Sequence, residues 1–302
     1  MGVVGESGSG KSVEAYSIIG LLQNPGKVVG GSITFEGQDM LSKTKDEMIA
    51  FRGKEVAMIF QNPMTSLDPV FKIGHQMVEM IREHEKISKK DAWNKAVEAL
   101  KLVGIPEAEK RMDAYPHELS GGMCQRVIIA MAVCGHPKLI IADEPTTALD
   151  VTVQAQVLEL LKDLQKKLNT AILLITHNLG VVWEMCDTVM VMYAGNTVEY
   201  ADTKTLYQEP LHPYTWGLLD SMPKLSSSAK EDLKTIPGTP PDLRLTGYCC
   251  NFYNRCPYAT EICRQQVPPL KEVAPGHFVA CHRQDGEHRL TRGEVNETCR
   301  KM

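Results

Sequence analysis

The feature that most constrains this chain is the run Gly5-Glu6-Ser7-Gly8-Ser9-Gly10-Lys11-Ser12, which satisfies the pattern Gly-x-x-x-x-Gly-Lys-Ser/Thr in full. This pattern predicts a tight turn between a buried strand, indicated here by Val3-Val4, and the first turn of a helix. Backbone N–H groups in such a loop, together with the positive end of the helix, bind phosphate groups. We expect Lys11 to reach the β- and γ-phosphates of a nucleotide and Ser12 to ligate Mg²⁺. The residues expected to bind the nucleotide here are Gly5, Ser7, Gly8, Gly10, Lys11 and Ser12.

A second element supports this interpretation. The apolar run Leu139–Ala142 predicts a buried strand and is followed directly by Asp143 and Glu144. Carboxylates at the carboxyl end of a parallel strand project into the crevice where such sheets bind ligands. We expect Asp143 to hold Mg²⁺ through its water shell, and Glu144 to orient and deprotonate an attacking water molecule.

Composition excludes several classes of function. With 43% hydrophobic and 23% charged residues, the chain has the balance of an ordinary globular protein. Its formal net charge of -4 gives no basic field to attract nucleic acid or anionic lipid. The longest apolar stretches are far shorter than the roughly 20 residues of a membrane-spanning helix. We therefore expect a soluble protein that reaches a membrane only through a partner.

The order of predicted elements indicates an α/β fold with a mostly parallel sheet covered on both faces. Further predicted strands and helices alternate along the chain, and a helical region interrupts them at about residues 62–135. The predicted strands are Ser32–Phe35, Val56–Ile59, Ala171–Ile175 and Thr188–Met192, and the predicted helices are Ile73–Glu85, Lys89–Val103, Gly121–Cys134 and Val151–Leu168. From about Leu206 many prolines break the pattern, and Ser226–Ala229 is expected to be a flexible link. We expect one domain at 1–205 and a C-terminal module with little regular structure at 206–302.

Here the sequence resembles the ABC ATPases. Leu119-Ser120-Gly121-Gly122-Met123 resembles their signature, with Met123 in place of the usual glutamine, and it lies between the phosphate loop and the acidic strand as it does in that family. Gln61 matches the glutamine of the Q-loop, which senses Mg²⁺ and faces the membrane partner. Ala148-Leu149-Asp150 matches the D-loop, and His177 matches the switch histidine that contacts the γ-phosphate.

The resemblance implies a P-loop NTPase of ABC type that hydrolyses ATP as a dimer. Ser120 and Gly122 begin a helical run, so their hydroxyl and N–H groups form a second anion-binding cap. In the family this cap closes over ATP held by the opposite subunit, so one chain alone cannot complete a site. The implied catalytic residues are Glu144, His177 and Gln61, the implied additional ATP contacts are Ser120, Gly122 and Asp150, and the implied Mg²⁺ ligands are Ser12, Gln61 and Asp143.

Other segments resemble the oligopeptide and dipeptide importer branch of that family. They are Asn62–Pro69, Tyr115–Glu118, His212–Thr215 and Ile236–Pro241. The branch implies uptake of peptides, or of nickel or another small solute. The implied partners are a second ATPase subunit forming a heterodimer, two transmembrane permease subunits and, indirectly, an extracytoplasmic binding protein. The implied location is the cytoplasmic face of the plasma membrane.

Two alternatives remain open at this point. A soluble, non-transport ABC protein is one, although such proteins usually carry two cassettes or a long coiled coil. The other is a non-catalytic remnant, because the phosphate loop begins four residues after Met1. Family members have a few dozen residues before this loop, including an aromatic that stacks on adenine, so we expect the chain to be truncated at its N-terminus.

Five of the nine cysteines lie between Cys249 and Cys281. In a reducing compartment such clustering favours metal or iron–sulfur ligation over disulfides. Cys250, Cys256, Cys263 and Cys281 match cysteines that hold a [4Fe–4S] cluster in some members of the branch. Their thiolates also suit Zn²⁺, and unligated thiols are the third alternative.

Overall fold

The computed structural model describes residues 1–147, 149–222, 235–284 and 289–292. The chain forms two compact units, which we name the central unit (Ser12–Leu174) and the terminal unit (Met1–Lys11 with Ile175–Met302). Ala148 of the expected D-loop and the expected link at 226–229 lie outside the described residues. Within the described ranges, every helix is too short or too polar to span a bilayer.

The strands of the central unit are short, apolar and buried. They are β4 (Val56–Ile59), β5 (Leu139–Asp143) and β6 (Ala171–Ile175, whose last residue belongs to the terminal unit), adjacent in that order. β4 and β5 run parallel, with Val56 opposite Leu139 and Ile59 opposite Ala142. This is the pattern of a parallel sheet covered on both faces. Residues 34–39 form a separate hairpin of β2 (Thr34–Phe35) and β3 (Gln38–Asp39), so only part of the strand predicted at Ser32–Phe35 is a strand.

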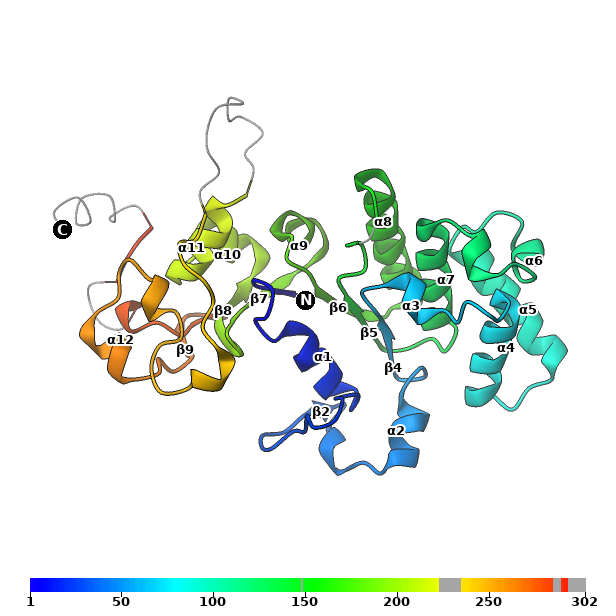
Figure 1. Ribbon diagram of the computed structural model, residues 1–302, viewed down its shortest axis with the longest axis horizontal. Helices are drawn as coiled ribbons and strands as arrows, with labels where there is room; N and C mark the ends of the chain where they lie inside the picture. The colour runs from blue at the N-terminus through cyan, green and yellow to red at the C-terminus, as the bar shows by residue number, and fades with distance from the viewer. Residues whose placement is uncertain (148, 223–234, 285–288, 293–302) are drawn as a thin grey trace. The chain divides into compact units, whose positions relative to one another are not determined.

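Helices surround these strands and form the expected helical region. The helices of the central unit are α1 (Lys11–Ile18, whose first residue belongs to the terminal unit), α2 (Lys45–Phe51), α3 (Pro63–Ser66), α4 (Ile73–His84), α5 (Lys89–Leu102), α6 (Ala108–Arg111), α7 (Gly121–Val133) and α8 (Val151–Leu168), with the 3-10 turns η1 (Met40–Ser42) and η2 (Pro116–Glu118). Helices α4 to α7 gather beside one another (Figure 1). Their apolar faces bury Met77 and Ile81 of α4 and Ala96 and Leu100 of α5, as the predicted periodicity requires.

The terminal unit is built on a mixed sheet with strand order β1-β7-β8-β10-β9. These strands are β1 (Gly2–Val4), β7 (Thr188–Tyr193), β8 (Asn196–Asp202), β10 (His277–Val279) and β9 (Lys271–Ala274). β1 and β7 are parallel, and the remaining pairs are antiparallel. Its helices and 3-10 turns are α9 (Leu179–Met185), α10 (Thr203–Gln208), α11 (Pro213–Asp220), η3 (Leu243–Leu245), η4 (Tyr253–Arg255), α12 (Glu261–Gln265) and η5 (His282–Gln284).

The segment expected as a C-terminal module is joined closely to the rest of this unit. β10 pairs with β8, with Phe278 opposite Tyr200, and so extends the sheet. Buried rings of Tyr193, Tyr214 and Phe252 lie with centroids 4.6 to 5.4 Å apart. A shared sheet and a shared core therefore connect residues on both sides of the expected boundary at 205/206, and that domain boundary stays a prediction.

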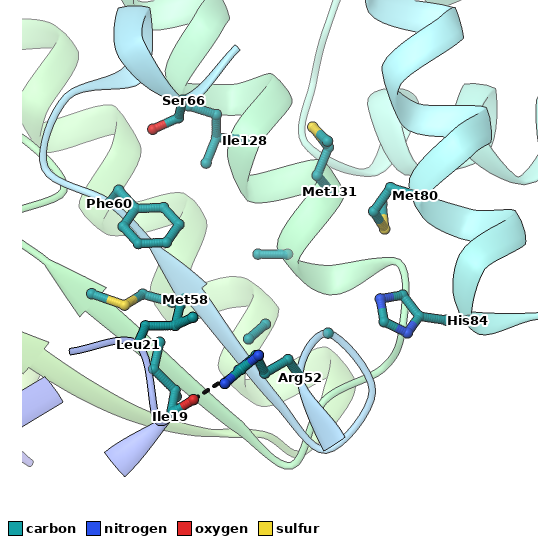
Figure 2. A pocket seen from close by; sticks show the side chains of 13 residues that line it. Ile19, Leu21, Arg52, Met58, Phe60, Ser66, Met80, His84, Ile128 and Met131 are labelled. Carbon is teal, nitrogen blue, oxygen red and sulfur yellow. Dashed lines mark hydrogen bonds between the residues drawn. The ribbon is translucent and has the colours of Figure 1, made fainter. Parts of the chain in front are cut away.

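The central unit contains an apolar pocket of about 270 Å³ (Figure 2). Met58 and Phe60, which precede Gln61, line it together with Met131 of α7. At its border, Arg52 donates a hydrogen bond from Nε to the carbonyl of Ile19 at 2.8 Å. The pocket thus lies beside the segment that leads into the expected Q-loop.

Candidate functional site

The phosphate loop connects β1 to α1, as the sequence predicts. A Cβ atom at Gly5 would lie 2.2 Å from the carbonyl oxygen of Met192, so only glycine fits there. Ser7 and Gly8 are exposed, and Gly10 is half-buried. The exposed part of the loop therefore offers its backbone to an external ligand.

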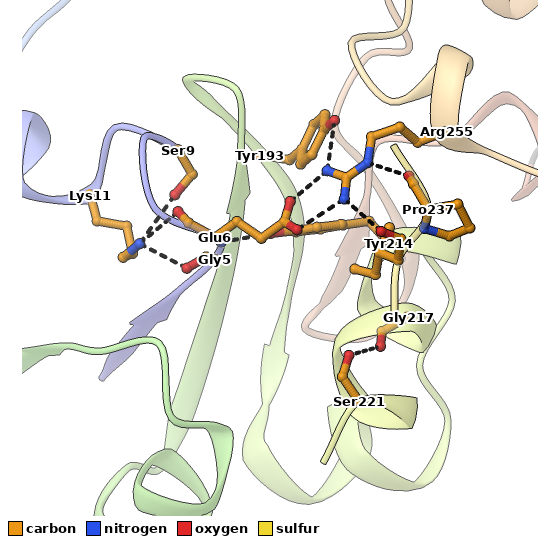
Figure 3. Close-up of polar contacts among 11 residues, drawn as sticks. Gly5, Glu6, Ser9, Lys11, Tyr193, Tyr214, Gly217, Ser221, Pro237 and Arg255 are labelled. Carbon is orange, nitrogen blue, oxygen red and sulfur yellow. Dashed lines mark hydrogen bonds and ion pairs between the residues drawn. The ribbon is translucent and has the colours of Figure 1, made fainter. Parts of the chain in front are cut away.

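The side chain of Lys11 forms hydrogen bonds within the phosphate loop. Its side chain is 6% exposed, and Nζ donates to the carbonyls of Gly5 at 2.8 Å and Glu6 at 3.0 Å and to Oγ of Ser9 at 3.4 Å. Figure 3 shows the ammonium group within reach of these three oxygens. A positive charge held inside a loop of backbone amides is the arrangement that binds polyphosphate.

Two polar pairs form in the central unit. The hydroxyl of Ser12 donates to Oδ1 of Asp143 at 3.0 Å, and Asp143 is 1% exposed. Nε2 of Gln61 donates to Oε2 of Glu144 at 2.9 Å. The structure therefore brings together Ser12 with Asp143 and Gln61 with Glu144, four of the residues selected from the sequence.

The backbone at Glu144 is unusual. Its φ of 45° lies in the left-handed region, which non-glycine residues rarely adopt. Here β5 ends, and the carboxylate also accepts a hydrogen bond from Oγ1 of Thr147 at 2.8 Å. Strained backbone of this kind clusters at functional sites, because surrounding contacts must hold it in place.

The signature segment caps a helix, as expected. The Ser120 side chain accepts a hydrogen bond from the amide of Met123 at 3.3 Å, at the start of α7. A Cβ atom at Gly122 would lie 2.6 Å from Cγ1 of Val153 on α8, which leaves no room for a side chain. The carboxylate of Asp150 caps α8 by accepting from the amide of Val153 at 2.9 Å.

His177 lies in the terminal unit, where it is exposed. The preceding Thr176 donates its amide to the carbonyl of Val3 at 3.1 Å. Asn178 follows and caps α9, its Oδ1 accepting from the amide of Gly180 at 2.9 Å. The histidine thus occupies a short connection between a strand end and a helix start.

Sequence reasoning missed one contact at the loop. The guanidinium of Arg255 binds both carboxylate oxygens of Glu6, at 2.6 and 3.0 Å (Figure 3). The hydroxyl of Tyr214 accepts a hydrogen bond from the amide of Glu6 at 2.7 Å. An acidic residue inside an anion-binding loop was the available signal, because such a charge needs a compensating partner.

Three of the four selected cysteines have raised pKa values. The pKa of Cys256 is raised to about 12, mainly by burial and in smaller part by the nearby Cys281, Cys250 and Cys263. Burial likewise raises the pKa values of Cys250 and Cys281 to about 11, and Cys263 contributes to both shifts. Across residues 1–147, 149–222, 235–284 and 289–292, no three His, Cys, Asp or Glu side chains are arranged to hold a metal ion.

Two histidines of the same region of the chain, His277 and His282, have other partners. The ring of His277 is hydrogen-bonded to the buried carboxylate of Glu199 at 2.8 Å. His282 is half-buried, and its ring is hydrogen-bonded to the carbonyl of Gln266 at 3.1 Å. Arg255 binds Glu6, as described above. These observations leave the thiols as the candidate ligands of this region.

Family models match two parts of the chain. Residues 1–147 match the model described as ABC transporter. Residues 198–263 match the model for the C-terminal region of oligopeptide/dipeptide transporters. The second match covers the segment that contains Cys250, Cys256 and Cys263.

Curated relatives and solved structures agree with these matches. The oligopeptide transport ATP-binding protein OppD of Bacillus subtilis is 55% identical over 280 residues, 92% of this chain and 78% of that protein. The dipeptide transport ATP-binding protein DppD of Escherichia coli is 48% identical over 282 residues, 93% of this chain and 86% of that protein. The dimeric ATP-binding cassette MJ0796 in a post-hydrolysis state bound to ADP and Pi superposes with a TM-score of 0.59 at 25% identity, covering 67% of this chain and 84% of that chain.

These similarities confirm the predicted ABC-type P-loop fold and the predicted branch. The chain belongs to the oligopeptide and dipeptide transport ATP-binding proteins of the ABC transporter family.

Proposed function

We propose that this chain binds and hydrolyses ATP as the motor subunit of a peptide importer. The observation that carries the proposal is the hydrogen bond between Ser12 and Asp143, which joins the end of the phosphate loop to the acidic strand. These two hard oxygen donors suit Mg²⁺, which prefers such ligands beside nucleotide phosphates. When bound, Mg²⁺ neutralises charge that develops on the transferred phosphoryl group.

The remaining residues are assigned the roles that the family resemblance implies. Lys11 and the loop amides bind the phosphates, and Gln61 is a further Mg²⁺ ligand. Glu144 accepts a proton from the attacking water, and its Oε2 is oriented by Gln61 and Thr147. His177 contacts the γ-phosphate.

A dimer completes each site in this proposal. Ser120 and Gly122 at the start of α7, with Asp150, face ATP held by a second ATPase subunit, and the pair is a heterodimer. Supporting this assignment, Ser120 caps α7, an arrangement that directs free amides outward from the helix start. The resemblance to the dimeric cassette MJ0796 also favours it.

Coupling to transport requires membrane partners. We assign two permease subunits, an extracytoplasmic binding protein and a peripheral position on the cytoplasmic face of the plasma membrane. The relatives named above act in oligopeptide and dipeptide transport. The apolar pocket lined by Met58, Phe60 and Met131, together with exposed Val70 and Phe71, offers a surface for a permease segment.

The cysteine segment is assigned a [4Fe–4S] cluster held by Cys250, Cys256, Cys263 and Cys281. Their mutual effect on pKa indicates that these thiols lie near one another. Metal charge would offset the raised pKa values by stabilising the thiolates.

The proposal is tested by ATP hydrolysis and peptide uptake in vesicles that contain the chain with its permease partners. Hydrolysis that needs Mg²⁺ and rises when a peptide-loaded binding protein is supplied is the expected result. Hydrolysis that is insensitive to peptide, with no uptake, would contradict the transport assignment. No hydrolysis in the complete assembly would contradict the enzymatic one.

A further inference from the structure

The phosphate loop is attached to two residues far along the chain. Glu6 lies between Gly5 and the exposed part of the loop, and it is fixed at both its backbone and its side chain. Tyr214, 208 positions away, accepts the Glu6 amide hydrogen at 2.7 Å. Arg255, 249 positions away, binds the carboxylate through both terminal nitrogens. Because Lys11 donates to the Glu6 carbonyl at 3.0 Å, the same residue also positions the loop ammonium.

Arg255 is itself rigidly held. Its side chain is 4% exposed, and its Nε donates to the carbonyl of Pro237 at 2.9 Å. Further contacts join it to the carbonyl of Ile236 at 3.2 Å and the hydroxyl of Tyr193 at 3.3 Å. A planar guanidinium with its donors engaged on both sides fixes a carboxylate more strictly than a lysine would.

Charge makes this contact relevant to a nucleotide. Glu6 belongs to a loop whose amides attract anions, and its carboxylate points toward Arg255 (Figure 3); an uncompensated negative charge on this residue would repel phosphate. Arg255 neutralises that charge and fixes the direction in which the Glu6 side chain points. The Glu6 side chain is 29% exposed and that of Arg255 is almost fully buried. Water therefore screens the attraction between the two charges only in part.

We infer that Arg255, which directly precedes Cys256, is a positioning residue for the phosphate loop and sets its affinity for nucleotide by neutralising and orienting Glu6. Tyr214 assists by fixing the Glu6 backbone. The inference rests on the proposed function, because it requires that the loop binds ATP. It also makes the C-terminal region part of the support of the nucleotide site.

The test is binding of the non-hydrolysable analogue AMP-PNP with Mg²⁺, measured by calorimetry. Arg255→Gln should raise the dissociation constant at least about fivefold, the lower end of typical coupling between sites. Adding Glu6→Gln to that variant should restore most of the affinity, since it removes the uncompensated charge. A purely structural role for Arg255 would leave the double variant as weak as the single one.

Arg244→Gln is the matched control. This variant also removes one arginine charge from the C-terminal region of the chain. Arg244, however, is 88% exposed and pairs only with nearby Asp242 among the contacts described. Its affinity should match that of the unchanged protein. A second variant, Tyr214→Phe, keeps the buried ring and removes only the acceptor, so it covers the case in which Arg255→Gln fails to fold. It should weaken binding by about twofold or more.

The outcomes separate the two proposals. If Lys11→Ala loses binding while Arg255→Gln and Tyr214→Phe bind as the unchanged protein does, the inference is overturned and the nucleotide site stands. If the double variant fails to recover affinity, the charge argument is overturned. If the unchanged protein binds no AMP-PNP, the proposed function fails and the inference falls with it.

Discussion

The hydroxyl of Ser12 donates a hydrogen bond of 3.0 Å to Oδ1 of Asp143, although 131 positions separate the two residues. Ser12 lies in the first turn of α1, and Asp143 is the last residue of β5. This hydrogen bond thus connects the start of α1 with the end of β5. In the proposed function this pair becomes the Mg²⁺ site.

Ser12→Ala should raise the Mg²⁺ concentration needed for half-maximal hydrolysis by about tenfold or more, a loss comparable to removing a partner of a metal ligand. The alanine removes one proposed ligand and the hydrogen bond from Ser12 to Asp143. A Mg²⁺ titration of ATP hydrolysis measures the effect. Ser12→Thr keeps the hydroxyl and should behave as the unchanged protein does. Equal Mg²⁺ requirements for the alanine and threonine variants would contradict the assignment of Ser12 as a Mg²⁺ ligand.

Glu144→Gln should lower kcat by about 10²- to 10⁴-fold while leaving ATP affinity nearly unchanged, because the amide keeps the shape but cannot accept the proton. Hydrolysis and equilibrium binding are measured on the same preparation. Thr147→Val removes only the hydroxyl that donates to Glu144 at 2.8 Å, so its kcat should fall by a smaller factor. Near-normal turnover in Glu144→Gln would assign the base to another residue.

Gly122→Ala should destabilise the central unit by about 1–3 kcal/mol, the usual cost of overpacking. The new methyl group would lie 2.6 Å from Cγ1 of Val153. Urea denaturation measures the loss, and Val153→Ala in the same chain should restore part of it by making room. Gly121→Ala is the matched control and should cost less, because its new methyl group would lie 3.8 Å from the nearest atom, Cδ2 of Leu149. Equal losses at both glycines would contradict the packing argument.

His212 should make folding stability depend on pH. Burial lowers its pKa to about 4, against the opposing effects of Glu199 and the Ala280 carbonyl. Its Nδ1 accepts the amide hydrogen of Tyr214 at 3.0 Å, which requires a neutral ring. The unfolded chain, with a pKa of about 6.5, binds this proton first. The contribution of His212 is therefore fully present above about pH 6.5 and is lost as the pH falls toward 4.

His212→Asn keeps a side-chain acceptor for the start of α11 and cannot titrate. Between about pH 6.5 and 4, the free energy of unfolding should fall more steeply in the unchanged protein than in this variant, by up to about 1.4 kcal/mol per pH unit. Chemical denaturation at a series of pH values gives both curves. His282→Asn, the same substitution at a half-buried histidine that does not accept the Tyr214 amide hydrogen, is the matched control and should give the curve of the unchanged protein. Parallel curves for His212→Asn and the unchanged protein would refute the assignment.

Local sequence patterns predicted much of the fold. The bounds predicted for β4, β6 and α8 agree with the structure, because a continuous apolar run or a helical repeat is visible within each segment. Ser12 and Asp143 were each selected from a motif as residues for Mg²⁺, and the structure joins them by a hydrogen bond. Motifs of this kind carry their three-dimensional arrangement with them.

Other contacts had no local signal. Arg255 lies in a proline-rich segment with little periodicity, so its partner Glu6 could not be identified by spacing. The pairing of β10 with β8 depends on a tertiary arrangement that two short strands do not encode. The position of Glu144 was predicted, but its left-handed backbone was not, because glutamate has no preference for that conformation.

The cysteine segment gives the last prediction. Purified without oxygen, the chain should contain about four irons and absorb broadly near roughly 400 nm if it holds a [4Fe–4S] cluster. Cys256→Ser should abolish both signals, because Cys256 is one of the four proposed ligands and its thiol is influenced by the other three. Cys249→Ser is the matched control: Cys249 is adjacent to a proposed ligand but outside the proposed set, so iron and colour should remain. Iron analysis and absorption spectra of the three proteins decide the assignment. One zinc ion per chain in a colourless preparation would transfer the site to zinc, and a metal-free preparation would leave the thiols unligated.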